Sequence, residues 1–129
     1  MAKVPVLDWE RSTLGHPAEA WRAAKAEVRG LLVDTARRRS VITYTEIADA
    51  VTSVKVPRQG SALGQATGQL LGQVVMEESR RLGRIFMISA VAVSVEMKPS
   101  SGFRGLAEDL GVSGEWEHWL PLVWRQYSQ

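Results

Sequence analysis

The 129-residue sequence contains no cysteine and only two histidines. Without cysteine the chain can form no disulfide, no thiolate metal site and no cysteine nucleophile, and it suits any redox compartment. His16 lies near the N-terminus and His118 lies among tryptophans, and neither has an obvious serine or acidic partner. The sequence therefore predicts a protein without a cofactor, a resident metal or a catalytic site.

Long hydrophobic runs are also absent. The longest apolar run, near residues 85–95, is too short to cross a bilayer, and the opening residues MAKVPVLDWERS contain no apolar segment of signal-peptide length. We therefore expect a cytoplasmic protein with no membrane partner. Apolar residues still make up 45% of the chain, which is enough to form the core of a single domain.

Neither sign of charge is in large excess, since the formal net charge is only +2. The charges are unevenly distributed, however. Residues 37–84 carry eight Lys or Arg against four acids, whereas residues 96–129 carry three basic residues against five acids. Such a distribution would give the fold one basic and one acidic face, although solvated surface without a partner is the alternative interpretation.

The spacing of apolar and turn-forming residues predicts a mainly helical α+β fold. Residues 1–16 have no clear period and are interpreted as an arm anchored by Trp9. Helices are expected at residues 17–37, 45–51 with Thr45 as N-cap, 60–82, 103–111 and 115–127, the last kinked or interrupted by Pro121. Strands are expected at residues 41–44 and 85–97.

This order of elements is typical of a winged helix-turn-helix, in which the second and third helices form the reading pair and the later strand and turn supply the wing. We divide the chain into an N-terminal arm (1–16), a winged-helix-like domain (17–112) and a Trp-rich C-terminal helical tail (113–129). All three are expected to belong to one globular unit.

Glycine recurs at every fourth position of the third expected helix, at Gly60, Gly64, Gly68 and Gly72. Each interior glycine costs about 1 kcal/mol of helix stability relative to alanine. Positions four apart lie nearly above one another, so these residues form a glycine stripe that another backbone can approach closely. The stripe therefore predicts a close contact, but not which partner makes it.

Two common explanations of such a stripe can be excluded. It lacks the spacing of a dinucleotide fingerprint and the Gly-Lys-Ser or Gly-Lys-Thr ending of a P-loop, and Gln65, Gln69 and Gln73 exclude a membrane-spanning helix. Either the stripe packs against the first helix or a second copy of the chain, or its Gly and Gln face contacts a nucleic-acid backbone.

A stretch near the middle of the chain resembles a known family. The run VRGLLVDTARRRSVITYTEIADAV resembles the opening of the winged-helix DNA-binding domain of alkylguanine-DNA alkyltransferases and alkyltransferase-like proteins, which carry a strand, a TYG-(E/D)-IA turn and a short helix. SALGQA (61–66) resembles the start of their recognition helix, and SGFRG (101–105) resembles their SGYRGG stretch. The resemblance covers residues 28–112 and implies a groove-binding helix, with Tyr44 as a phosphate contact.

The sequence departs from this family at two positions that matter. The family's Pro-Cys-His-Arg motif, which carries the alkyl-accepting cysteine, is replaced by ISAVAV at residues 88–93. The arginine that the family inserts into the base stack falls near Ser61. Both groups that handle the extrahelical base are therefore absent, which excludes alkyl transfer and argues against recognition of a damaged base.

These observations favour a non-enzymatic winged-helix protein that binds duplex DNA through its third helix. The expected nucleic-acid contacts are Arg37, Arg38, Arg39, Tyr44, Arg58, Ser61, Gln65, Gln69 and Lys98.

Two alternatives from other classes stay open. The first is a protein–protein interaction module, either a homodimer or a small subunit of a bacterial or phage assembly, which would bury the glycine stripe or Trp116, Trp119 and Trp124. The second is a small metal-dependent nuclease, because Glu96 and Lys98 form an E-x-K pattern at a strand end. The preceding strand lacks the further acid that such a site requires.

Overall fold

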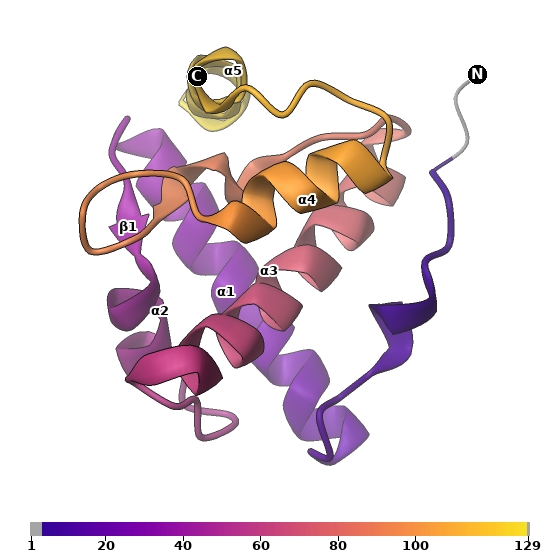
Figure 1. Cartoon of the computed structure of the whole chain (residues 1–129), viewed down its shortest axis with the longest axis vertical. Coiled ribbons are helices and arrows are strands. Elements are labelled where there is room, and N and C mark those ends of the chain that lie inside the picture. Colours follow the sequence, from indigo (N-terminus) through magenta and orange to yellow (C-terminus); the bar gives the residue numbers. More distant parts are fainter. Residues whose placement is uncertain (1–3, 129) are drawn as a thin grey trace.

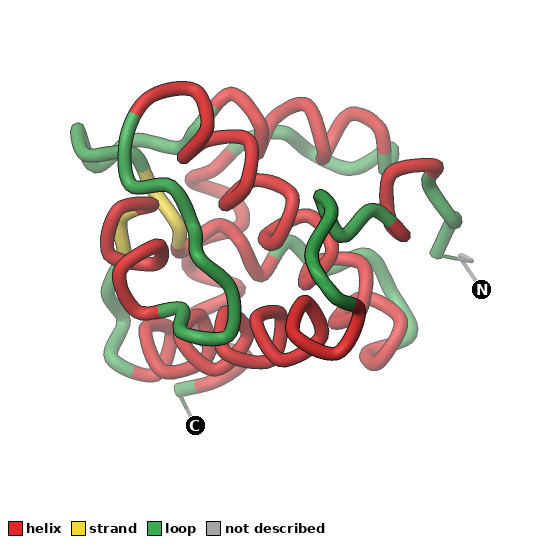
Figure 2. The backbone as a smooth tube through the Cα atoms, turned by 90° about the horizontal axis from the view of Figure 1, so that it is seen from below, coloured by secondary structure: helices red, strands yellow, loops and turns green. Residues whose placement is uncertain are grey.

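A computed structural model describes residues 4–128 of the protein. The α-helices are α1 (Ala18–Arg37), α2 (Tyr44–Ala50), α3 (Gly60–Leu82), α4 (Ser101–Asp109) and α5 (Trp116–Tyr127). The strands are β1 (Ile42–Thr43) and β2 (Ala92–Val93), and two 3₁₀-helices are η1 (Asp8–Arg11) and η2 (Ile88–Val91). Figure 2 shows how little of the backbone is strand, so the expected mainly helical α+β fold is confirmed. In the described part of the chain, every helix is too short or too polar to cross a membrane.

Helices α1 and α3 cross at the centre of the molecule and supply much of its core (Figure 1). The buried residues of α1 recur every three or four positions, as in Trp21, Ala24, Val28 and Leu32, and therefore occupy one face of the helix. The expected helices at 17–37 and 60–82 are confirmed to within one residue at each end. Gly83 ends α3 in the left-handed conformation, with φ of +74°.

The two halves of α3 have different surroundings. Residues 60–66 are mostly exposed, whereas residues 70–79 are all buried except Glu77. The second half therefore forms part of the core, and the first half projects from it.

The expected strand over residues 85–97 is wrong in most of its length. Residues 88–91 form η2, and only Ala92 and Val93 pair with Ile42 and Thr43, in parallel, across a connection that contains α2 and α3. Residues 86–93 are buried throughout, and a continuous apolar run does not distinguish a strand from another buried segment. The chain then turns sharply at residues 94–98, where the Ser94 amide donates to the Lys98 carbonyl at 2.8 Å.

Two further expectations about helix ends need correction. Helix α2 is capped by Thr43 rather than Thr45, because the Thr43 hydroxyl accepts from the amide of Glu46 while the Glu46 carboxylate accepts from the amide of Thr43. Helix α5 includes Pro121, so the expected interruption of the helix there is wrong. Pro121 is exposed, so the carbonyl that loses its partner there can be hydrated.

Three tryptophans hold α5 and the preceding loop on the body of the protein. The indole N–H of Trp116 donates to the Ala90 carbonyl at 2.6 Å, and that of Trp124 donates to the Ser40 carbonyl at 2.9 Å. Trp119 is 8% exposed and donates to Ser113. These three tryptophans are thus used in packing within the chain.

A buried carboxylate joins the three long helices. Glu78 of α3 is 1% exposed and accepts hydrogen bonds from Arg29 of α1, Arg81 of α3 and Tyr127 of α5. Burial alone would raise the pKa of the Glu78 carboxyl, but the hydrogen bonds from Arg81, Arg29 and Tyr127 outweigh it and lower the pKa to about 2. Glu78 is therefore ionised at neutral pH.

Replacing Glu78 by glutamine should destabilise the fold in a pH-dependent way. A carboxyl whose pKa falls from 4.5 to about 2 on folding contributes about 3 kcal/mol, fully present above pH 4.5 and lost as the pH falls toward 2. We expect Glu78→Gln to lower the free energy of unfolding, measured with urea, by about 3 kcal/mol at pH 7 and by much less at pH 3.

Glu77 provides the matched control for this experiment. It pairs with Lys25 at 2.5 Å, but 55% of its side chain is exposed, so Glu77→Gln should change the stability by less than about 1 kcal/mol. Equal losses in the two variants, or a loss in Glu78→Gln that does not change between pH 7 and pH 3, would contradict this account.

Candidate nucleic-acid interface and adjoining cavity

The first two turns of α3 present a small, polar surface. Gly60, Ser61, Gly64 and Gln65 are exposed, and a Cβ atom built at Gly60, Gly64 or Gly68 would meet no atom within 4 Å. These three glycines of the stripe therefore do not pack against α1 or any other described element. A flat backbone or ring could reach this surface without meeting a side chain on the stripe.

The fourth glycine of the stripe does make a close contact. A Cβ atom at Gly72 would lie 2.9 Å from Cη2 and 3.0 Å from Cζ3 of Trp9. The partner is thus the indole of the N-terminal arm, rather than the backbone of α1 or of a second copy. Trp9 anchors the arm, as the sequence predicts.

Two glutamines of α3 also hold the arm. Gln69 donates from Nε2 to the Trp9 carbonyl at 2.7 Å, and Gln73 donates to the Ser12 carbonyl at 2.6 Å. Gln73 in turn accepts from the indole N–H of Trp21 at 2.8 Å. Gln69, an expected nucleic-acid contact, is therefore engaged within the chain, and Gln65 is the glutamine of this series that stays exposed.

An ion pair completes the attachment of the arm. Arg80 of α3 contacts Glu10 at 2.6 Å and also donates to the Pro5 carbonyl at 2.9 Å. Burial acts to raise the pKa of the Glu10 carboxyl, but hydrogen bonds from Arg80 and the Leu7 amide outweigh it, so the net pKa is lowered. Glu10 is therefore charged at neutral pH.

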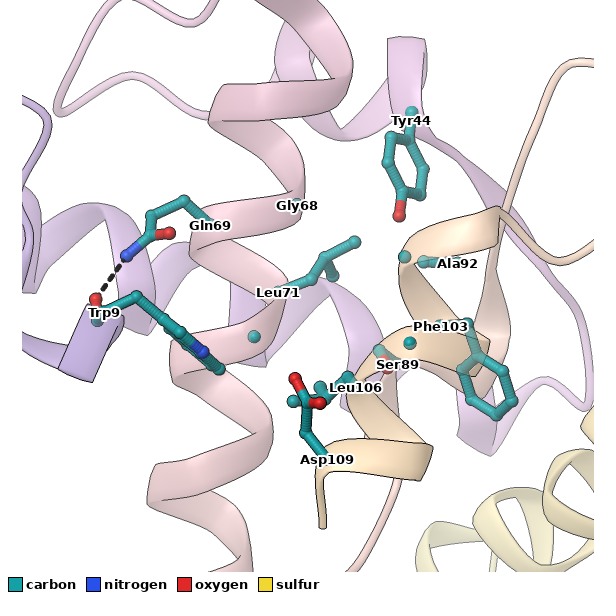
Figure 3. A pocket seen from close by; sticks show the side chains of 13 residues that line it. Trp9, Tyr44, Gly68, Gln69, Leu71, Ser89, Ala92, Phe103, Leu106 and Asp109 are labelled. Carbon is teal, nitrogen blue, oxygen red and sulfur yellow. Dashed lines mark hydrogen bonds between the residues drawn. The ribbon is translucent and has the colours of Figure 1, made fainter. Parts of the chain in front are cut away.

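A cavity of about 320 Å³ lies beside the middle of α3 (Figure 3). It is bounded by the N-terminal arm, α3, the segment η2–β2 and α4. Its walls include Trp9, Tyr44, Gly68, Leu71, Ser89, Phe103 and Asp109. The volume is near the lower end of the range for small-molecule sites, roughly 300 to 1,000 Å³.

Some of the polar groups that line the cavity make hydrogen bonds within the chain, and others do not. The Tyr44 hydroxyl shares a hydrogen bond of 2.7 Å with Ser100, and burial raises the pKa of Tyr44, so it stays a neutral phenol. Ser89 is only 6% exposed, and its hydroxyl makes no hydrogen bond to any described side chain or backbone group. Asp109 forms no ion pair with any described residue, and Figure 3 shows its carboxylate facing the cavity from α4. The cavity therefore holds a free hydroxyl and a free carboxylate.

The structure separates the expected nucleic-acid contacts into distant groups. Arg58 lies in the loop before α3, close in sequence to Ser61, but it forms an ion pair with Asp49. Arg37, Arg38 and Arg39 are exposed at the end of α1, next to α5, which Figure 1 shows at the opposite end of the molecule from the start of α3.

Tyr44 and Lys98 lie neither at the start of α3 nor at the end of α1. Tyr44, expected to contact a phosphate, lines the cavity instead, with its hydroxyl on Ser100. Lys98 lies in the exposed turn that follows β2, as does Glu96. Residues 4–128 contain no group of three His, Asp or Glu side chains that could hold a metal ion.

Sequence reasoning missed the cavity, and with it the positions of Trp9, Ser89 and Asp109 in its wall. Nothing local in the sequence indicates that Trp9 and Asp109 face one cavity, because the arm and α4 meet α3 only in the folded chain. Ser89 could have been found, since it lies in the stretch that replaces the acceptor motif of the alkyltransferase family.

Comparison of the chain with protein-family models, with curated proteins and with solved structures finds no match.

The glycine stripe gives a direct test of this geometry. Gly64→Ala should raise the free energy of unfolding by about 0.5 to 1 kcal/mol, because alanine favours the helix and meets open space. The change in the free energy of unfolding caused by Gly72→Ala should be less favourable than that caused by Gly64→Ala by at least about 1 kcal/mol, since the Trp9 ring must move. Urea unfolding measures both changes.

Limited proteolysis reports on the arm in the same variants. Arg11 is exposed in the arm, so trypsin should cleave after it faster in Gly72→Ala than in Gly64→Ala or the unmodified protein. Equal stabilisation by the two substitutions, with unchanged cleavage, would show that Trp9 does not pack on Gly72.

Proposed function

We propose that the chain is a non-enzymatic DNA-binding protein that docks the exposed start of α3 on a duplex and holds one extrahelical base in the adjoining cavity. One observation carries the proposal. The stripe formed by Gly60, Gly64 and Gly68 runs from the exposed helix start to the cavity wall, and no atom of the described residues lies within 4 Å of a Cβ built on it.

The start of α3 suits a nucleic-acid backbone. Since nothing lies within 4 Å of the missing Cβ atoms, a sugar-phosphate strand can approach the helix closely. Ser61 and Gln65 offer exposed hydrogen-bonding groups on the same two turns, and Lys55 brings positive charge in the loop before them, where the charge of Arg58 is paired with Asp49. The resemblance of residues 61–66 to the start of a recognition helix supports the same placement.

The cavity suits a nucleobase. Its walls are aromatic and apolar around a few polar groups, which is the usual character of a pocket that receives an extruded base. Gly68 belongs both to the stripe and to the cavity wall, so a base leaving a duplex docked on α3 has a short path. The sequence alone argues against recognition of a damaged base, because the acceptor cysteine and the intercalating arginine of the alkyltransferase family are absent. The proposal of a base in the cavity rests instead on the shape and lining of the cavity.

The proposal includes no chemical step. Ser89 lies in the stretch that corresponds to the family's acceptor motif, and neither histidine lines the cavity. His16 stacks on Trp21, and His118 lies against Trp119. No described side chain is therefore placed to activate Ser89 as a nucleophile in the way that histidine activates serine.

A charge placed on the docking surface should weaken DNA binding. Gln65→Glu puts a carboxylate beside the proposed position of the phosphates, and we expect its dissociation constant for a duplex of about 20 base pairs to rise roughly tenfold at low salt. Fluorescence anisotropy of a labelled duplex measures the change, and the unmodified protein should bind more weakly as the salt rises from about 50 to 200 mM.

Arg37→Gln is the matched control, since it changes the net charge by the same amount at the opposite end of the molecule. Its dissociation constant should stay within about twofold of that of the unmodified protein. Equal weakening by both substitutions would indicate binding through overall charge alone. No binding of the unmodified protein at tens of micromolar would refute the proposal and favour a protein partner.

A further inference from the structure

Trp9 differs from the other four tryptophans of the chain. The indole N–H groups of Trp21, Trp116, Trp119 and Trp124 each donate to an oxygen of the protein, at 2.6 to 2.9 Å. The indole N–H of Trp9 has no such acceptor among residues 4–128, although the side chain is half-buried. Its ring forms part of the cavity wall instead.

The Trp9 ring is nevertheless fixed in position. Its six-membered ring lies against Gly72, and its own carbonyl accepts from Gln69 at 2.7 Å. The next residue, Glu10, is held by Arg80. A ring that is immobilised before a ligand arrives loses little entropy on binding, which favours a contact role.

The remaining walls of the cavity offer unused polar groups. Ser89 can donate or accept a hydrogen bond, and the Asp109 carboxylate can only accept. Figure 3 shows Trp9 on one side of the space and Asp109 facing the cavity from α4. A matching ligand is flat, to lie along the indole, and carries an N–H group on its edge for Asp109.

We infer that Trp9 is a ligand-contacting residue that stacks on a planar heteroaromatic ring in this cavity, while Asp109 accepts from an N–H group on the edge of that ring and Ser89 bonds a second edge atom. The inference rests on the proposed function and names the group that enters, a nucleobase with an amino or imino N–H. It also adds a residue from the arm, which lies outside the stretch, residues 28–112, that resembles the alkyltransferases.

The test compares two duplexes and two substitutions of Trp9. The duplexes, each of about 20 base pairs, differ only in a central G·C pair or G·T mismatch, and the mismatched guanine costs less to extrude. The unmodified protein should bind the mismatched duplex about tenfold more tightly, because less free energy is lost in extruding the mismatched guanine to stack on Trp9.

The two substitutions separate stacking from attachment of the arm. Trp9→Leu keeps an apolar side chain against Gly72 but cannot stack, whereas Trp9→Phe keeps an aromatic ring. We expect Trp9→Leu to lose the preference for the mismatched duplex and Trp9→Phe to retain most of it. Trypsin cleavage after Arg11 shows whether the arm stays attached in both variants.

Each outcome decides a different point. If Trp9→Leu keeps the preference, or Trp9→Phe loses it to the same degree with the arm attached, Trp9 does not stack on the base. If the unmodified protein binds both duplexes equally, no base enters the cavity, although binding of DNA through α3 survives.

A second measurement does not depend on duplex binding. Free guanosine, titrated into the labelled protein, should shift the nuclear magnetic resonance signals of the Trp9 indole N–H and the Ser89 amide, and this shift should disappear in Trp9→Leu. Shifts by guanosine without any duplex binding would refute the proposed function and keep the inference. Absence of both would refute both.

Discussion

The buried carboxylate of Glu78 is the interaction on which the arrangement of the helices depends. It lies 1% exposed on α3 and accepts hydrogen bonds from Arg29 on α1 and Tyr127 on α5, so it fixes the second half of α3 against two other helices. A buried charge is costly unless it is fully paired, which leaves few alternative packings of these three helices. The position of α3 in turn determines where its exposed first half and the cavity lie.

The packing of the second half of α3 against α1 and α5 also explains how this helix tolerates four glycines. Gly64 and Gly68 lie inside the helix, where each costs about 1 kcal/mol relative to alanine and no described contact offsets the loss, whereas Gly60 has a φ of +69°, which favours glycine. The offset comes from the second half of the helix, where residues 70–76 are all buried. The core thus stabilises the start of a helix whose first three glycines make no packing contact and so contribute nothing to the stability of the fold.

The sequence predicts the helices well and the site poorly. Helices α1 and α3 follow from the spacing of apolar residues, and the end of α3 follows from Gly83, because these signals are local. The expected strand over 85–97 is wrong in most of its length, since the buried apolar run at residues 86–93 has no distinguishing period. The cavity depends on contacts between residues far apart in the chain, such as Gln69 with the Trp9 carbonyl, and no spacing along the sequence encodes them.

The use of the glutamines limits how the proposed DNA complex can select its target. Gln69 and Gln73 are occupied by carbonyls of the arm, so the open face of α3 keeps Ser61 and Gln65 as its exposed hydrogen-bonding side chains. One bidentate contact to a base edge discriminates by only about 1 to 3 kcal/mol, which is far from enough to define a site in a genome. If the proposed function holds, the choice of DNA site must therefore depend on the cavity. A base would be selected there by its shape, by its N–H groups and by the free energy needed to extrude it from the duplex.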